Sequence, residues 1–594
     1  MQRPLLEASP KASPTGKATK RYQEWVASHP RLSRYTKALR PRVIYEPLGP
    51  RQIRILELQP GRGTEPFQGR FIVASIDSNV EYDALSYMWG DPTPVDKILV
   101  AGAAIPLASN LSTALRYIRN SKEPQPARIW IDAICINQDD IREREQQVAM
   151  MRTVYSNAQT VRIWINEPDL VEDNPAIAAL CEFRHSPDHV TSLGHDDAYF
   201  WEPVLPLFTN DYWNRFWIQQ EILNAQHLAL HSKAWGVMAR NHSLCNTPAS
   251  LDFYAYHVER ARTNSLVKLL YRCRTAVASR SQDRLYAIMH LANDYEEGSI
   301  NVDYSKSSVQ IMLEAASYHV NRNGDLGEYF LHITNWQEEL DPDERVLEQE
   351  VIPTWNPRIW FGLDADKFNA VRRYQYDDPS RTRCPPFSVD TSARHLTVRG
   401  VRVEFVGRVL RHRSWLAGAT VGQFWSSDFG KFLVSDSNAG WQHLSQEVTK
   451  VLAACAADET GHEDIVTTLE YLSSLGREVT LLNAMETDPP SKIRGEVFTG
   501  FMMDVRNNVA FTTRVGYFGS APVCGLKEGD EIWMILGCNT PIIVRPQPNG
   551  AYWHISTTYI PKIIEHEDIV QHLTSEVQLG DKVGQWIVQD IQLE

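Results

Sequence analysis

The sequence contains few cysteines, and none of them stands in a pattern that binds a metal or builds a redox centre. Eight Cys occur among 594 residues, without a CxxC pair or a regular framework. This scatter favours a reducing compartment, and we predict a cytoplasmic protein. His185, His189 and His195 are loosely spaced and match no HExxH or Cys/His pattern, which favours surface histidines over ligands. We therefore expect no metal site.

The glycine patterns of nucleotide-binding loops are also missing. The chain has no GxxxxGK[ST] and no complete GxGxxG, and the pair Gly61-Arg-Gly63 lacks the third glycine, so it predicts a turn. A P-loop NTPase and a redox dinucleotide enzyme are disfavoured, and no bound cofactor is expected.

Two further absences concern membranes and nucleic acids. No apolar run approaches the about 20 residues needed to cross a bilayer, and the N-terminus lacks the apolar core of a signal peptide. The formal charge of −13 argues against sequence-independent binding to DNA or RNA, whose phosphates require Lys and Arg. Residues 1–42 are locally basic and rich in Ser and Pro, which is typical of a solvated tail. We predict no membrane span and no nucleic-acid partner.

The length of the chain exceeds what one hydrophobic core usually supports, so several domains are expected. Periodicity predicts an α/β domain at 43–235, a helical region at 236–384 and a β-rich module at 385–594, interrupted by helices near 440–485. Within the first domain, Ile53–Leu58 predicts an additional strand and Leu107–Ile118 predicts a helix.

Three apolar, strand-like runs each end in a polar cluster that packing alone does not require. If they are neighbouring parallel strands, their polar ends meet at the edge where open α/β sheets bind ligands. A strand, helix, strand order favours such a parallel arrangement. The runs and the polar residues that follow them are Tyr82–Gly90 with Asp91, Arg128–Asp132 with Cys135, Asn137 and Gln138, and Val161–Ile165 with Asn166 and Glu167.

A helix is predicted over Ile141–Ala158, because apolar residues recur there on one stripe. Asp140 precedes it and Glu143 follows three residues later, a spacing that indicates helix capping rather than catalysis. Cys135 lies between two isoleucines, and such an apolar setting raises a thiol pKa, which disfavours a nucleophile.

The segment Trp213–Ile222 is predicted as one helix with Trp213, Trp217 and Glu221 on the same stripe. A carboxylate beside aromatic surface is neutralised, paired or kept for function. The residues alone leave two alternatives: an ion pair between Glu221 and Arg142 or Arg144 that fastens the helix to the sheet, or a functional carboxylate.

Several stretches of the sequence resemble the fungal heterokaryon-incompatibility (HET) domain proteins in wording, order and spacing. Weaker echoes occur at 53–61, 280–292, 302–307, 511–519 and 529–546, so the resemblance touches most of the chain. The strongest matching words are YDALSYMWGD at 82–91, IWIDAICINQDDIREREQQVAMMRTVYSNAQTVRIWI at 129–165 and YWNRFWIQQEI at 212–222.

The order of these strands and the Trp-x-x-x-Glu word is similar to the Toll/interleukin-1 receptor (TIR) domain, to which HET domains are distantly similar. The resemblance implies a flavodoxin-like, Rossmannoid parallel sheet flanked by helices. In catalytic TIR domains a glutamate after a tryptophan supports cleavage of the nicotinamide–ribose bond of NAD, and Glu221 matches it, although four positions separate it from Trp217 where TIR motifs have three.

An NAD-cleaving site would use Glu221 to stabilise the positive charge that develops on the ribose. Trp89 or Trp217 could stack on nicotinamide or adenine, although core packing is the commoner role of either tryptophan. The other residues expected at the sheet edge are Gly90, Asp91, Asp132, Asn137 and Gln138.

The resemblance implies an intracellular protein of self/non-self recognition that triggers cell death. In one version the domain is an NAD nucleosidase completed by homotypic assembly, with NAD as substrate. In the alternative it is a non-catalytic adaptor that signals by homotypic assembly or through another incompatibility protein. An enzyme unrelated to defence also remains open, because fold does not determine function.

Overall fold

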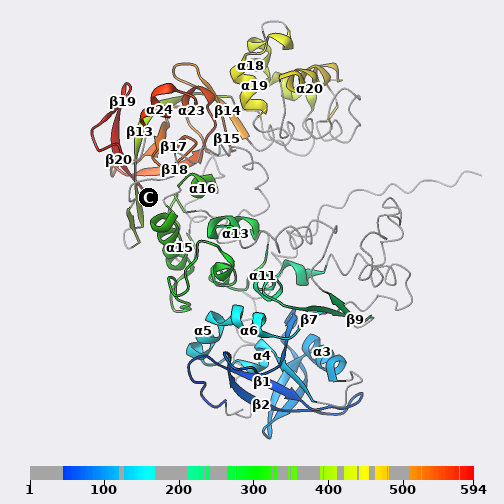
Figure 1. Cartoon of the computed structure of the whole chain (residues 1–594). Helices are drawn as coiled ribbons and strands as arrows, with labels where there is room; N and C mark the ends of the chain where they lie inside the picture. The colour runs from blue at the N-terminus through cyan, green and yellow to red at the C-terminus, as the bar shows by residue number, and fades with distance from the viewer. Residues whose placement is uncertain are drawn as a thin grey trace, which may run out of the picture. The chain divides into compact units, whose positions relative to one another are not determined.

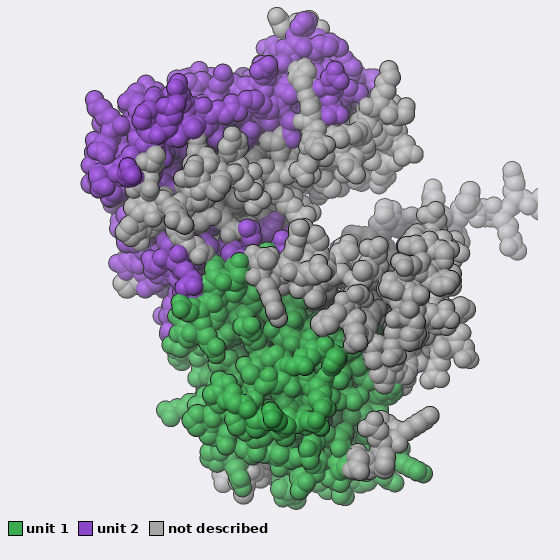
Figure 2. Space-filling view, viewed as in Figure 1, with its two compact units in different colours: residues 1–264, 275–305 green, residues 265–274, 306–594 purple. Residues whose placement is uncertain are grey.

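A computed structural model shows the chain as two compact units (Figure 1). Unit 1 comprises residues 1–264 and 275–305, and unit 2 comprises residues 265–274 and 306–594 (Figure 2). The residues that the structure describes are 45–119, 126–166, 210–232, 235–240, 264–274, 276–323, 326–331, 346–347, 350–356, 388–391, 394–410, 420–437, 440–453, 462–475, 477, 479–480, 508–522, 525–573 and 576–594. The predicted basic tail and the three loosely spaced histidines lie outside them.

The centre of unit 1 is a group of parallel strands, as the three apolar runs predict. Strand β3 (Asp83–Tyr87) lies between β6 (Ala127–Trp130) and β7 (Val161–Ile165) and is parallel to both. Ala84 is opposite Trp130 on one side and Val161 on the other. β3 and β7 are buried along almost their whole length, which agrees with their nearly continuous apolar sequence.

The complete sheet of unit 1 is mixed, so the prediction of a parallel sheet holds for β6, β3, β7 and β8 and for the pair β2 and β4, but not for the whole sheet. The strand order is β5-β4-β2-β1-β6-β3-β7-β8-β9. The antiparallel pairs are β1 with β2, β1 with β6, β4 with β5, and β8 with β9. The bounds of the additional strands are β1 (Gln52–Leu58), β2 (Phe67–Ser75), β4 (Pro94–Val100), β5 (Ala103–Ala108), β8 (Leu228–Ser232) and β9 (Trp235–Arg240).

The helix after β5, α3 (Ser109–Arg119), begins two residues later than predicted, because β5 continues to Ala108. The next predicted helix is two helices, α5 (Ile141–Ala149) and α6 (Met151–Asn157), separated at Met150. The Asp140 side chain accepts hydrogen bonds from the backbone N–H groups of Arg142 and Glu143, which confirms the predicted cap. Tyr155 of α6 packs edge-on against Trp130, with ring centroids 5.6 Å apart.

The described middle of the chain is mainly helical, although β9 extends to Arg240 and two short strands, β10 (Val346–Leu347) and β11 (Glu350–Val351), pair with each other. Its helices are α13 (Leu266–Arg272), α14 (Asp283–Tyr286), the 3-10 helix η4 (Met289–Leu291), α15 (Ser308–Asn323) and α16 (Leu326–Leu331). The short helices α14 and η4 belong to unit 1, whereas α13, α15 and α16 belong to unit 2.

Unit 2 contains a β-rich sheet organised around one long strand, β13 (His395–Leu410). Its first half pairs with β20 (Trp586–Leu593) and β16 (Glu531–Ile535), and its last residues pair with β14 (Asn508–Thr513). Irregular register at Arg402/Glu404 and Val406/Arg408 lets one strand serve both groups of partners. The remaining members are β12 (Ser388–Asp390), β15 (Phe518–Pro522), β17 (Ile542–Pro546), β18 (Tyr552–Thr557) and β19 (Lys582–Val583).

Helices interrupt this sheet, as the sequence predicts, but they begin earlier than residue 440. They pack around a separate apolar core to which Leu410, Ala510 and Phe518 of the sheet contribute. The helices are α17 (Val421–Ser426), α18 (Asp428–Asp436), α19 (Gln446–Ala453) and α20 (His462–Ser474). Among the described residues, no helix combines the length and the apolarity that crossing a membrane requires.

Candidate functional site

The segment that carries the predicted catalytic glutamate is two short helices rather than one. The 3-10 helix η2 (Asp211–Asn214) ends before Arg215, which is extended, and α11 (Ile218–Leu223) begins after Trp217. The break arises because the backbone around Arg215 bridges to Val277. Trp213 therefore does not share a helical stripe with Trp217 and Glu221.

Glu221 is buried, with 2% of its surface exposed. Its carboxylate accepts a hydrogen bond from the hydroxyl of Ser86 on β3, and its Oε2 lies 3.6 Å from Nη1 of Arg215. Neither Arg142 nor Arg144 is its partner, so that prediction was wrong: the guanidinium of Arg144 instead lies 4.9 Å from the ring centroid of Tyr304. Burial raises the pKa of Glu221, although Arg215 and Ser86 act in the opposite direction.

Asp132 stands where β6 ends and the single-turn helix α4 (Asp132–Cys135) begins. Its Oδ2 accepts a hydrogen bond from the Trp89 indole at 2.9 Å, and its Oδ1 accepts one from the Ala133 N–H at 2.7 Å. Burial raises the pKa of Asp132, and Arg215 is the largest opposing influence. Arg215 thus interacts electrostatically with two carboxylates, Asp132 and Glu221, which together raise the pKa of its guanidinium.

We call this group the Arg215 cluster: Ser86, Trp89, Asp132, Arg215 and Glu221. Its ionised form has two negative charges and one positive charge, so it carries one excess negative charge. The nearby phenols of Tyr87 and Tyr155 stay neutral, because burial and the two carboxylates raise the pKa of each. The cluster brings together three sequence-predicted residues, Trp89, Asp132 and Glu221.

The other predicted site residues occupy different settings. Asp91 is exposed and its carboxylate accepts hydrogen bonds from the N–H and hydroxyl of Thr93, which makes it a turn residue. Gly90 has a positive φ of 66°, a conformation that favours glycine and turns the chain after Trp89. Asn166 is also exposed, at the end of β7.

The two tryptophans differ from each other. Trp89 is 46% exposed, so its side chain is not in the core. Trp217 is partly buried against the core of unit 1, and its indole donates a hydrogen bond to Asp283. Of the two, only Trp89 presents a large accessible ring surface beside the Arg215 cluster.

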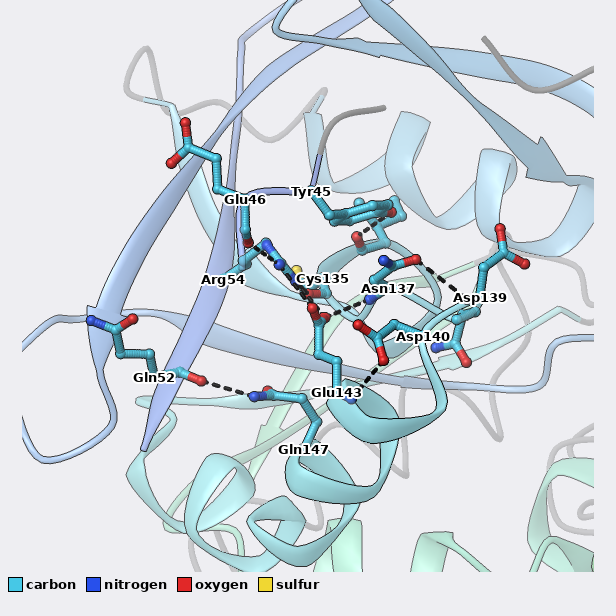
Figure 3. A network of polar contacts seen from close by, with 12 residues as sticks. Tyr45, Glu46, Gln52, Arg54, Cys135, Asn137, Asp139, Asp140, Glu143 and Gln147 are labelled. Carbon is cyan, nitrogen blue, oxygen red and sulfur yellow. Dashed lines mark hydrogen bonds and ion pairs between the residues drawn. The ribbon is translucent and has the colours of Figure 1, made fainter. Parts of the chain in front are cut away.

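Asn137 lies in a network that holds the loop after α4 (Figure 3), and Gln138 bonds to the backbone of α4. The Gln138 amide donates to the Asp132 carbonyl at 2.9 Å, and the Asn137 N–H donates to Glu143 Oε1 at 2.7 Å. Glu143 therefore does not bond back to its helix cap, but pairs with Arg54 of β1 at 2.5 and 2.9 Å.

Arg54 completes this network and is 1% exposed. Its guanidinium also donates to the carbonyls of Cys135 at 3.2 Å and Glu46 at 2.5 Å, and lies 4.8 Å from the ring centroid of Tyr45 (Figure 3). The Tyr45 hydroxyl donates to the Ile134 carbonyl. The loop that begins at Asp132 is thus tied to β1 through Arg54.

Nucleophilic and metal chemistry find little support in the described residues. Burial raises the pKa of the Cys135 thiol to about 12, as its apolar neighbours predict. No group of three or more His, Cys, Asp or Glu residues within the described ranges is arranged to hold a metal ion.

Comparison with known proteins shows a family similarity for the region that contains the Arg215 cluster. Residues 82–221 match the family "Heterokaryon incompatibility protein (HET)". The chain is also similar to heterokaryon incompatibility protein 6, OR allele, of Neurospora crassa, with 39% identity over 142 residues. The similarity covers 22% of this chain and 21% of that relative, so it concerns one domain of each protein. No solved structure matches the chain significantly.

The HET domain contains all five members of the Arg215 cluster, from Ser86 to Glu221. Strand β1 with Arg54 precedes the matched region, and β8 follows it, yet both are strands of the same sheet. The physical unit in which the HET domain folds is accordingly longer than the matched segment.

Sequence reasoning missed two arginines that pair with the carboxylates of this region, the buried Arg54 and the partly buried Arg215. A common signal could have found both: each is a lone arginine inside an apolar run, Ile53-Arg54-Ile55 and Asn214-Arg215-Phe216-Trp217. A charge in such a run requires a buried partner.

Proposed function

We propose that the chain is a heterokaryon-incompatibility protein that acts in self/non-self recognition and triggers cell death. The observation that carries this proposal is the HET match at residues 82–221, supported by the similarity to the Neurospora crassa incompatibility protein. We place the protein in the cytoplasm and expect its partner to be a second copy of the domain or another incompatibility protein.

The first candidate for the signal is hydrolysis of NAD by the HET domain. Water would add to the ribose carbon as the bond to the nicotinamide nitrogen breaks. Nicotinamide leaves with the bonding electron pair and becomes neutral, ADP-ribose keeps the new hydroxyl, and one proton is released. A carboxylate facing the ribose stabilises the positive charge that develops there.

The Arg215 cluster supports this candidate through charge and exposure. With both carboxylates ionised, its excess negative charge suits a cationic nicotinamide ring, and Trp89 offers an exposed ring on which a flat base can stack. Asp132 is fixed beside that ring by the Trp89 hydrogen bond. Asp132 and Trp89 would hold the ligand, and Glu221 would stabilise the ribose.

The second candidate is a non-catalytic adaptor that signals by homotypic assembly, and the burial of Glu221 favours it. With Ser86 and Arg215 as partners, Glu221 fastens α11 to β3 in the conformation described. Catalysis would require assembly to draw Glu221 away from these partners, so the two candidates differ in what assembly does to this side chain.

A direct experiment compares nicotinamide release with cell death. The purified full chain, dilute and concentrated, is incubated with NAD, and nicotinamide is measured by chromatography. The same chain is expressed in a filamentous fungus to score death. Glu221→Gln is tested beside Glu57→Gln, which removes a different buried carboxylate of the same sheet, one paired with Arg70 and Arg128.

Release that rises with concentration and is lost in Glu221→Gln but kept in Glu57→Gln supports the enzyme. Cell death without release, retained in Glu221→Gln, supports the adaptor. A chain that causes no death under any incompatible pairing and releases no nicotinamide contradicts the proposed function.

A further inference from the structure

Residues 276–305, here called the clamp segment, lie outside the HET match but inside unit 1. The chain enters this segment from residues 265–274 of unit 2 and returns to unit 2 at residue 306. Helix α14 and η4 belong to it. Its contacts with the segment 211–223 converge on both sides of Arg215.

The first contact is a backbone bridge. The Val277 N–H donates to the Asn214 carbonyl at 2.5 Å, and the Phe216 N–H donates to the Val277 carbonyl at 2.9 Å. These bonds hold the residues immediately before and after Arg215. They also account for the extended backbone that separates η2 from α11.

The second contact comes from Arg284, which is buried. Its guanidinium lies 5.3 Å from the ring centroid of Phe216 and donates to the Ala276 carbonyl at 2.7 Å. Arg284 thus links Ala276, which precedes Val277, to Phe216, which follows Arg215.

The third contact comes from Asp283, which is also buried. Its carboxylate accepts hydrogen bonds from the Trp217 indole and from the Tyr304 hydroxyl, the latter at 2.7 Å. Trp217 precedes α11, and its carbonyl accepts the Glu221 N–H at 3.2 Å. Asp283 therefore helps to position α11, the helix that carries Glu221, through Trp217.

Tyr304 anchors the far end of the clamp segment to helix α5. Its ring contacts two guanidiniums, those of Arg144 at 4.9 Å and Arg280 at 5.2 Å from the ring centroid. Its N–H donates to Glu145 Oε1 at 2.8 Å. The clamp segment is thereby fixed to the HET domain at several independent points.

We propose that the clamp segment positions Arg215 between Asp132 and Glu221, so that the functional domain extends to residue 305 rather than ending near 221. The inference rests on the proposed function only in assuming that the Arg215 cluster is the working site. Asp283 and Arg284 are positioning residues, because they act on the cluster through Trp217 and Phe216.

The test uses the full chain labelled with 5-fluorotryptophan, with the Trp89 signal assigned through Trp89→Phe. Because the Trp89 indole donates to Asp132, its fluorine shift follows the ionisation of the coupled Asp132 and Glu221 pair as pH changes. Asp283→Asn keeps the size of the side chain while removing the charged acceptor. Asp77→Asn, which removes an exposed carboxylate paired with Arg51 in the same unit, is the control.

In Asp283→Asn we expect the midpoint of this titration to rise by about one pH unit, because a displaced Arg215 stabilises the Asp132 carboxylate less. Hydrogen exchange should accelerate in the 211–223 peptide but not in the β1 peptide. The Asp77→Asn control should change neither. A loss of global stability alone would not move the midpoint of the folded state.

If Asp283→Asn does not fold, Tyr304→Phe replaces it, since this variant keeps the contacts of the ring with the two arginines and removes only the hydroxyl bond to Asp283. A smaller rise in the same midpoint is expected. A midpoint and an exchange pattern identical to those of the parent would overturn the proposal. The measurement needs no NAD, so a chain that lacks NAD hydrolysis still tests it.

Discussion

Unit 1 contains two guanidiniums, those of Arg54 and Arg215, whose carboxylate partners are arranged in opposite ways. Arg54 makes two short hydrogen bonds to one carboxylate, Glu143, and donates to two backbone carbonyls as well. Nη1 of Arg215 lies 3.6 Å from Oε2 of Glu221, and the same guanidinium also interacts electrostatically with Asp132. Within the described part of the chain, this Nη1 makes no hydrogen bond. One pair is saturated, whereas the other is shared.

The difference teaches how to separate a structural ion pair from a site. A saturated, bidentate pair is specific in geometry and costly to break, because either partner left alone is a buried charge. A cation shared between two carboxylates leaves negative charge uncompensated, so that site responds to protons, to cationic ligands and to small displacements. Arg54 therefore fixes the loop after α4, whereas Arg215 lowers the pKa of the two carboxyl groups of Asp132 and Glu221.

The largest effect that would sharpen this contrast is expected on breaking the saturated pair. Arg54→Met keeps the length of the side chain but strands Glu143, so we expect the free energy of unfolding of unit 1 to fall by about 3–5 kcal/mol. Urea unfolding followed by hydrogen exchange of unit 1 peptides measures it. Arg51→Met, which breaks the exposed pair with Asp77, should leave the same peptides unchanged. Equal losses in both variants would erase the distinction.

A second effect concerns His231 on β8, which burial keeps neutral. Burial, with Arg162 nearby, lowers the pKa of His231 to about 4. Between pH 6.5 and 4 the imidazole of His231 is protonated in the unfolded chain but neutral in the folded chain, so stability falls as pH falls. From pH 7 to 5 we expect a loss of about 2 kcal/mol. In His231→Phe this part of the pH dependence should vanish, and its persistence would assign the sensitivity to other groups.

The shared pair should tolerate substitution better than the saturated one. We expect Glu221→Gln to change the free energy of unfolding at pH 7 by less than about 1 kcal/mol, because the amide still accepts from Ser86 and Arg215 keeps Asp132. Glu143→Gln should cost clearly more. A Glu221→Gln loss as large as that of Glu143→Gln would show that both pairs are structural anchors.

The sign of the pH dependence gives a check on the same variant. The pKa of Glu221 is raised in the folded chain, so its ionisation opposes folding, and stability declines as pH rises through the unfolded pKa of a glutamate toward the folded one. Glu221→Gln removes this decline. Relative to the parent, the variant should therefore fare better at pH 7 than at pH 4.

The smallest signal is expected at Cys135, whose carbonyl accepts from Arg54. A buried thiol with a pKa of about 12 should remain unmodified by iodoacetamide at pH 8 in the folded parent. Peptide mass spectrometry detects the modification. Arg54→Met should make Cys135 react, while Glu221→Gln should not; reaction in the parent would contradict the tight network around Arg54.

The sequence predicted the central strands of unit 1 and the main strands of the C-terminal sheet, because buried strands are short apolar runs with clear boundaries. It missed the β4–β5 hairpin. That turn is Ala101-Gly102, with φ values of 51° and 80°, whereas the usual hairpin signal at such positions is Asn-Gly or Asp-Gly. The mixed character of the sheet was not predicted, because this hairpin was missed and because the antiparallel pairing of β1 with β6 was not expected.

The candidate site was predicted in part. Asp132 and Glu221 were identified because carboxylates next to apolar runs are unusual, and Trp89 because it follows a strand. The partners of these residues were not identified, and the predicted pairing of Glu221 with Arg142 or Arg144 was wrong. Sequence spacing predicts which side chains lie together on one helix, but it does not predict which side chains of distant segments meet.

The sequence by itself determined which segments are apolar enough to be strands, where Asp140 caps a helix, and that residues 82–221 carry the wording of a HET domain. Only the tertiary structure decided which arginine faces which carboxylate, that Trp89 is exposed while Trp217 is held by Asp283, and that residues 276–305 return to the domain. The reason is physical. Local structure depends on neighbours along the chain, but the pairing of buried charges depends on groups brought together across tens or hundreds of residues.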